Sequence, residues 1–130
     1  GITAGDYVVY EGAYLGVIES VDEKTALARL ASSPGSTQDV IVGDPRAVSI
    51  AKGAGGGAYE LSVSRDVAVM SGDVVVFAGD ESLVLGIVRS VIGDELDTTQ
   101  QVLFSTPVSI AQLQFVRVIP RLETLAPLVP

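Results

Sequence analysis

One sequence run occurs twice in this chain, and it limits the folds that the chain can adopt. Gly5–Gly12 and Gly72–Gly79 both read Gly-Asp-x-Val-Val-aromatic-x-Gly. Each is followed by a second matched run, Leu15–Val21 in the first copy and Leu85–Val91 in the second. The first pair is offset by 67 positions and the second by 70, so the later copy has three extra residues in its turn. Two matched runs in the same order predict an internal duplication of a small β unit.

Glycines inside the duplicated unit indicate how its strands bend. Each copy begins with a Gly-Asp turn, continues as a short strand and returns as a longer one. Gly16 lies inside the longer strand of the first copy, and Gly86 occupies the matching place in the second. A glycine within a strand usually marks a bulge or a tight bend, which curved sheets and barrels need.

Composition agrees with an all-β fold. Hydrophobic residues make up 48% of the 130 residues, aromatic residues only 5%, and there is no Trp, which predicts a mainly aliphatic core. The abundance of Gly and the recurrence of Val favour strands and turns over helices. The one helical signal is Thr106-Pro107, a capping residue followed by a proline suited to the first helical position. We therefore predict two small similar β-barrels and one short helical turn near residues 107–113.

Four segments are expected along the chain. They are a first β-barrel module at 1–51, a Gly-rich link and connecting strand at 52–64, a second β-barrel module at 65–120, and an extended tail at 121–130.

Charge and segment lengths exclude several classes of function. The formal net charge of −8 disfavours binding to nucleic acids and to anionic lipid surfaces, because both carry negative phosphates. No run of about 18 apolar residues is present, so no membrane-spanning helix is predicted. The first residues carry no basic segment or initiating Met, so they do not resemble a signal peptide, and the chain is expected to be an excised fragment.

The residues needed for common catalytic sites are missing. His and Cys are both absent, which removes the usual base for a nucleophile, the thiolate nucleophile and the commonest zinc ligands. Asp6 and Asp73 lack the context of an aspartic protease pair and are predicted to cap turns. The segment 52–57 lacks the ending of a phosphate-binding loop and is predicted to be a hairpin tip or a link.

The remaining charged clusters also predict no chemistry. Asp80-Glu81 and Asp94–Asp97 lack the ligand spacing of an EF-hand and are expected at solvated hairpin tips. Lys24 and Lys52 both lie in expected turns. We therefore expect no enzyme activity, no catalytic residue, no metal and no cofactor.

The order of motifs resembles that of the bacterial cell-shape protein family MreC. Asp66–Val76 resembles the family's segment that leads into Gly-Asp-Leu-Val-Val, and Leu85–Val91 is similar to its Val-Gly-x-Val-x-x-Val strand. Residues 102–107 and 111–118 resemble its closing proline, short turn and final Val-rich strand. Upstream, 1–21 and the Gly-rich run before Tyr59-Glu60-Leu61 also match in order.

Three departures mark the chain as a divergent member. Phe77-Ala78-Gly79 replaces the usual Thr-Ser-Gly, the loop 80–85 is shortened, and the family's first strands have no counterpart here.

The resemblance implies a scaffold that is not an enzyme. Members of the family have a cytoplasmic tail, one membrane helix, a dimerising coiled coil and an extracytoplasmic pair of β-barrels, to which this chain would correspond. The implied partners are further copies of itself, the wall-synthesis transpeptidase and other membrane proteins of the elongation complex. Contacts would use strand edges and apolar patches, with Tyr10, Tyr14 and Phe77 as candidate residues; packing in the core is the alternative role for each.

Two other classes of function remain open from the residues. A periplasmic adaptor of a secretion or efflux system, of the membrane-fusion type, has β-barrels with similar Gly-Asp-x-Val turns. A protease-like double barrel is the enzymatic alternative, and the absence of His argues against it.

Overall fold

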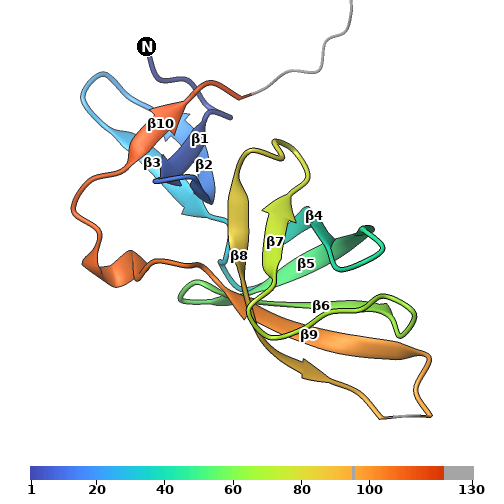
Figure 1. Cartoon of the computed structure of the whole chain (residues 1–130). Coiled ribbons are helices and arrows are strands. Elements are labelled where there is room, and N and C mark those ends of the chain that lie inside the picture. The colour runs from blue at the N-terminus through green and yellow to red at the C-terminus, as the bar shows by residue number, and fades with distance from the viewer. Residues whose placement is uncertain (95, 122–130) are drawn as a thin grey trace, which may run out of the picture.

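The computed structural model describes residues 1–94 and 96–121, whose regular structure is almost entirely β (Figure 1). A single turn of 3-10 helix, η1, lies between the last two strands. The elements in chain order are β1 (Tyr7–Tyr10), β2 (Ala13–Val21), β3 (Ala26–Leu30), β4 (Thr37–Val42), β5 (Ala47–Gly55), β6 (Ala58–Ser64), β7 (Val74–Phe77), β8 (Val84–Ile92), β9 (Thr99–Ser105), η1 (Ile110–Gln112) and β10 (Arg117–Ile119).

The two sequence copies form hairpins with the same register. In β1 and β2, Val8 pairs with Gly16 and a bulge follows. In β7 and β8, Val75 pairs with Gly86, and the bulge falls at the matching position. The agreement extends to the next strand, because β2–β3 and β8–β9 each carry one more irregularity at matching places. Shared register and shared bulges are what a copied unit would have, while the duplication itself stays a prediction.

The duplicated aspartates cap turns, as predicted. The backbone N–H of Thr3 donates to Oδ2 of Asp6 at 2.9 Å. The backbone N–H of Met70 donates to Oδ2 of Asp73, also at 2.9 Å. Each carboxylate thereby satisfies a backbone donor of the loop that leads into its hairpin, which is the usual role of Asp in such turns.

Six strands close into a barrel. The pairing runs β8-β7-β4-β5-β6-β9, and pairing of β9 with β8 completes the circle. The other four strands form a sheet in the order β10-β1-β2-β3, joined to the barrel by a parallel pair between Ala13 and Val84. Within the described residues, the outer strands β3 and β10 of this sheet do not pair with each other. The predicted all-β fold with small barrels is confirmed, with one barrel closed.

Strand pairing cuts across the modules expected from sequence. β4 lies within 1–51, yet it pairs with β7 of the segment 65–120. β5 runs across the expected boundary at residue 51, because it spans Ala47–Gly55. Conversely, β10 lies in the segment 65–120 and pairs with β1. The physical reason is burial, since Val40, Val42 and Ala51 fill the same core as β7 and β8. Whether the modules can fold apart stays a prediction, and residues 122–130 of the expected tail lie outside the described residues.

One core extends through both sheets. It is largely aliphatic, as expected, but it also contains two stacked aromatic pairs. The rings of Tyr14 and Phe77 stack with centroids 3.9 Å apart, and Tyr7 meets both edge-on. A second stack joins Tyr59 and Phe104 at 4.8 Å. A smaller cluster on the other face of the four-stranded sheet is covered by the chain from Val108 to Val118.

The helical turn is shorter than predicted and starts later. Ser109, not Thr106, is its N-cap, and no side chain caps it. Thr106 is buried, and its hydroxyl donates to the backbone oxygen of Gly57 at 3.1 Å. This bond ties the end of β9 to the β5–β6 turn. That turn lies in the Gly-rich segment, so the predicted hairpin tip is confirmed; Gly55, Gly56 and Gly57 all have positive φ.

Replacing Gly86 by Ala should destabilise the barrel at its bulge. A Cβ at this position would lie 2.5 Å from the backbone oxygen of Ser105, a contact that the backbone must move to relieve. Overpacking of this kind costs about 1–3 kcal/mol. The free energy of unfolding in urea measures the effect. Ser90→Ala, at an exposed position of the same strand, should change it by less than about 0.5 kcal/mol, and an equally small change for Gly86→Ala would contradict the close approach.

Candidate interaction surface

Outward-facing positions of four neighbouring strands carry aliphatic side chains. Val48 on β5 pairs with Ile41 on β4, Ile41 pairs with Val76 on β7, and Val76 pairs with Val84 on β8. The neighbours of these residues along each strand are mostly buried, so the row itself points away from the core. Further outward aliphatic residues flank it. We call this set the aliphatic face: Ile41, Val48, Ile50, Val74, Val76, Val84 and Ile87.

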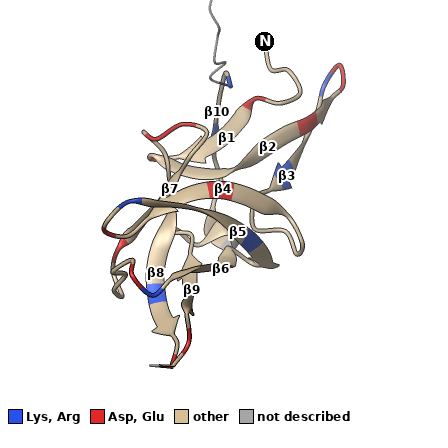
Figure 2. Cartoon of the chain, turned by 90° about the vertical axis from the view of Figure 1, so that its right-hand side faces the viewer, with Lys and Arg blue, Asp and Glu red and all other residues tan. Residues whose placement is uncertain are grey.

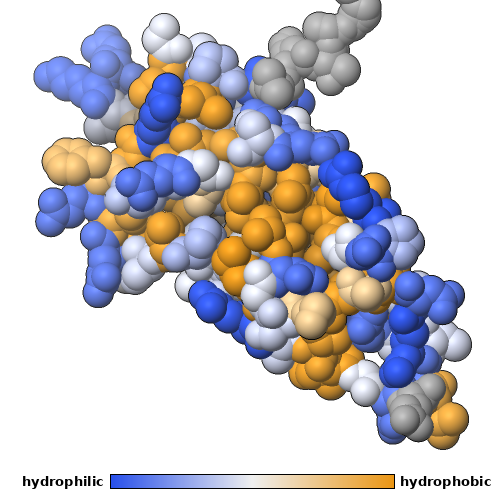
Figure 3. Space-filling model, viewed as in Figure 1, coloured by the Kyte–Doolittle hydropathy of each residue, from blue (hydrophilic) through white to orange (hydrophobic). Residues whose placement is uncertain are grey.

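The remaining strands of the same barrel provide a comparison. On β6 the outward positions include Glu60, Ser62 and Ser64, and on β9 they are Thr99, Gln101, Leu103 and Ser105. Most of these side chains are polar, as expected for the solvent side of an antiparallel sheet, and Leu103 is the large aliphatic one among them. The aliphatic face departs from that pattern, with Val48 at 75% and Ile50 at 62% exposed. Figure 3 shows hydrophobic surface gathered over the middle of the molecule, where Figure 1 places β7 and β8.

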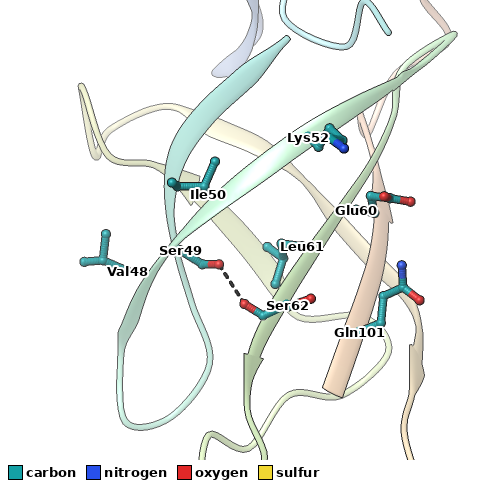
Figure 4. A pocket seen from close by; sticks show the side chains of 8 residues that line it. All are labelled: Val48, Ser49, Ile50, Lys52, Glu60, Leu61, Ser62 and Gln101. Atoms are coloured by element: carbon teal, nitrogen blue, oxygen red, sulfur yellow. Dashed lines mark hydrogen bonds between the residues drawn. The ribbon is translucent and has the colours of Figure 1, made fainter. Parts of the chain in front are cut away.

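A groove borders the aliphatic face where β5 separates from β6 (Figure 4). The ladder between these strands runs from the Gly-rich turn to the pair Lys52 and Glu60. Beyond that pair a single side-chain bond bridges the gap, from the hydroxyl of Ser49 to the backbone oxygen of Ser62 at 2.9 Å. The opening has a volume of about 490 Å³, and Val48 and Ile50 line it as well as the face.

Charges on and around the aliphatic face are few. Asp39 lies on it, because this exposed residue pairs with Ile50 across the β4–β5 ladder. Figure 2 shows this acidic position on β4 beside β5. No ion pair with Asp39 occurs among the described residues. At the rim, Arg46 binds Glu81 at 2.7 Å, and both side chains are more than half exposed. Such exposed pairs contribute little to stability.

The three contact residues expected from sequence occupy different environments. Tyr14 is 2% exposed and Phe77 is 7% exposed, so both lie in the core. Burial raises the pKa of the Tyr14 hydroxyl. Tyr10 is half-buried and packs against the smaller cluster. Tyr10 is thus the one of the three with side-chain surface open to a partner, and a role for any of them in binding stays a prediction.

Sequence reasoning did not single out the aliphatic face, although a signal was present. Val40-Ile41-Val42 and Val74-Val75-Val76 are unbroken aliphatic runs, not alternating ones. Such runs are typical of strands that are covered on both sides. Here one side faces the core and the other faces solvent. These two runs could therefore have predicted an outward aliphatic surface that another protein covers.

The described residues offer no catalytic cluster. They contain no group of three or more side chains suited to hold a metal ion. Asp80 accepts bonds from the backbone and hydroxyl of Ser82, which fixes its turn. Burial raises the pKa of the Tyr59 hydroxyl to about 12. The neighbouring hydroxyls bond to the backbone of Gly57: Thr106 donates to its oxygen, and Ser32 accepts from its N–H. No helix in the described part of the chain is long and apolar enough to cross a bilayer.

The fold and this surface define a class of protein: an all-β barrel domain whose most unusual surface feature is the aliphatic face. The sequence profile described as "Rod shape-determining protein MreC, barrel core" matches residues 1–120. The chain therefore belongs to the MreC family, which confirms the resemblance and favours a cell-shape role over the adaptor and protease alternatives.

Solved structures agree on the fold. MreC from Pseudomonas aeruginosa superimposes with a TM-score of 0.82 at 21% identity, over 92% of this chain and 81% of that one. A second structure, titled MreC, has the same score and identity over 92% and 72%. MreC from Listeria monocytogenes gives 0.77 at 20% identity, over 93% and 63%. No curated protein sequence matches the chain.

Substitutions should separate the core aromatics from the aliphatic face. Phe77→Ala removes a buried ring that stacks on Tyr14, and such truncations cost about 3–5 kcal/mol. Ile50→Ser changes an exposed side chain and should shift the free energy of unfolding by less than about 0.5 kcal/mol. Chemical denaturation followed by circular dichroism measures both. A large loss from Ile50→Ser would show that this residue serves the fold and not the surface.

Proposed function

We propose that the chain is the extracytoplasmic part of a non-catalytic scaffold for cell elongation and shape. The observation that carries this proposal is the family match over residues 1–120, which spans both sheets. The lack of a catalytic cluster in the described residues is compatible with it. In this proposal the scaffold is anchored to the membrane by a segment outside this chain, and it binds the wall-synthesis transpeptidase and other membrane proteins of the elongation complex.

Self-association belongs to the same proposal, and the edge of β3 supports it. The N–H and C=O of Ile18 both bond toward the β1 side, to Asp6 and Gly5. Its partner across the β2–β3 ladder is Ala28, whose backbone groups must then point away from β2. They face the free side of an edge strand, where a strand from another chain can add.

Proline at position 28 tests the edge. Ala28→Pro removes an outward N–H and leaves the β2–β3 bonds in place, so it should weaken self-association while the fold is kept. Sedimentation at increasing protein concentration measures the association. Ala28→Ser keeps the N–H and serves as the matched control. A wild-type chain that stays monomeric, or equal association of all three proteins, would contradict self-association through β3.

Cell shape tests the scaffold role itself. The full-length gene, expressed in its own host after depletion of the native copy, should maintain rod shape. The same gene with Phe77→Ala should yield rounded cells, because the core no longer holds the two sheets together. Cell length and width by microscopy are the readout. If depleted cells that carry neither the native gene product nor the added gene keep their rod shape, the proposed scaffold role is contradicted.

A further inference from the structure

The aliphatic face has the features of a surface that is covered in the assembled protein. Seven outward aliphatic residues lie on four contiguous strands, whereas the outward residues of β6 in the same barrel are polar. Monomeric proteins rarely expose apolar patches of this continuity without a binding role. The aliphatic residues are concentrated on one side of the barrel, with Leu103 on β9 as an outward aliphatic residue elsewhere, so general surface composition does not explain the pattern.

A single carboxylate decides what kind of surface can cover this face. Asp39 stands beside Ile50 and two positions before Ile41 on the same side of β4. Lys52, the nearest cation along β5, pairs with Thr37 and forms no ion pair with Asp39 in the described structure. Covering the face removes water from Asp39, and a carboxylate that loses water without a cationic partner is strongly disfavoured.

A second copy of this chain fits the face poorly. An interface built on one face with two-fold symmetry would bring Asp39 of each copy to the same surface. Self-association, as proposed above, would use the edge of β3, which belongs to the other sheet.

We propose that the aliphatic face docks a different protein, whose contact surface is aliphatic and carries a Lys or Arg that meets Asp39. This inference rests on the proposed scaffold function and specifies the partner-binding surface. The groove beside Val48 and Ile50 enlarges the contact area, because its apolar wall continues the face. Aliphatic packing supplies the affinity, and the ion pair at Asp39 fixes the register and selects the partner.

Photo-crosslinking in living cells tests this proposal. A benzophenone amino acid replaces Val48 in the full-length protein, and Thr99 is the control position on β9, exposed on the same barrel and outside the groove. We expect an adduct with one other protein from position 48, at a yield about tenfold or more above that from position 99. Mass spectrometry of the linked peptide should find aliphatic residues next to a Lys or Arg.

Charge variants test the part played by Asp39. Asp39→Lys should lower the yield of the adduct about tenfold, because two cations would then face each other. Asp66→Lys makes the same change at an exposed turn outside the face and should leave the yield unchanged. The inference is overturned by an adduct between two copies of this chain, by equal yields at positions 48 and 99, or by no adduct at 48. It is also overturned by a linked peptide without basic residues or by no effect of Asp39→Lys.

The shape of the same cells separates this inference from the function on which it rests. Rod-shaped cells that give no adduct at position 48 would overturn the docking surface and leave the scaffold role intact. Depleted cells that stay round with the unmodified full-length gene would count against the scaffold role. Circular dichroism of each purified variant confirms that a lost adduct is not a lost fold.

Discussion

The stack of Tyr14 on Phe77 is the contact on which the arrangement of the two sheets depends. Tyr14 belongs to β2 of the four-stranded sheet and Phe77 to β7 of the barrel. Few backbone bonds cross between the sheets, chiefly around the single pair of Ala13 and Val84. Side-chain packing must therefore hold them, and rings 3.9 Å apart with Tyr7 against their edges provide it. The smaller cluster on the opposite face of β1 and β2 is separate and is covered by the chain before β10.

Closure of the barrel determines which surfaces remain available for contacts. Apart from the groove where β5 separates from β6, the strands of the closed circle pair on both sides, so the barrel can contact another protein mainly through its outward side chains. The four-stranded sheet is different, because β3 is an edge and its residues Ala26 to Arg29 are exposed. The same chain thus has a side-chain surface on one sheet and a backbone edge on the other. These two kinds of surface bind by different physics, apolar burial in one case and main-chain hydrogen bonds in the other.

Local sequence predicted the hairpins well and their assembly less well. Turn residues such as Asp6 and Asp73 act within three positions, so their role could be predicted from the sequence alone. The partners of β4 and β10 could not, because each lies far away along the chain and burial selects it. Thr106 shows the same limit: a good capping residue forms instead a buried bond to Gly57, 49 residues away. For the candidate surface, Tyr14 and Phe77 were candidate contacts with core packing as the alternative, and both side chains are buried because the core has few other aromatics.

The two proposed contacts can act together because a rigid core connects the sheets that carry them. A scaffold must hold two partners at a fixed distance, which requires separate surfaces on a body that does not bend between them. The β3 edge and the aliphatic face lie on different sheets, and one continuous core fills the space between those sheets. Bending at the junction would have to break the aromatic stack and expose the buried Tyr14, which costs several kcal/mol by the usual scale for buried aromatics. In the proposed scaffold, the core would therefore keep the two proposed contacts at a fixed distance, and its stability is part of the proposed function.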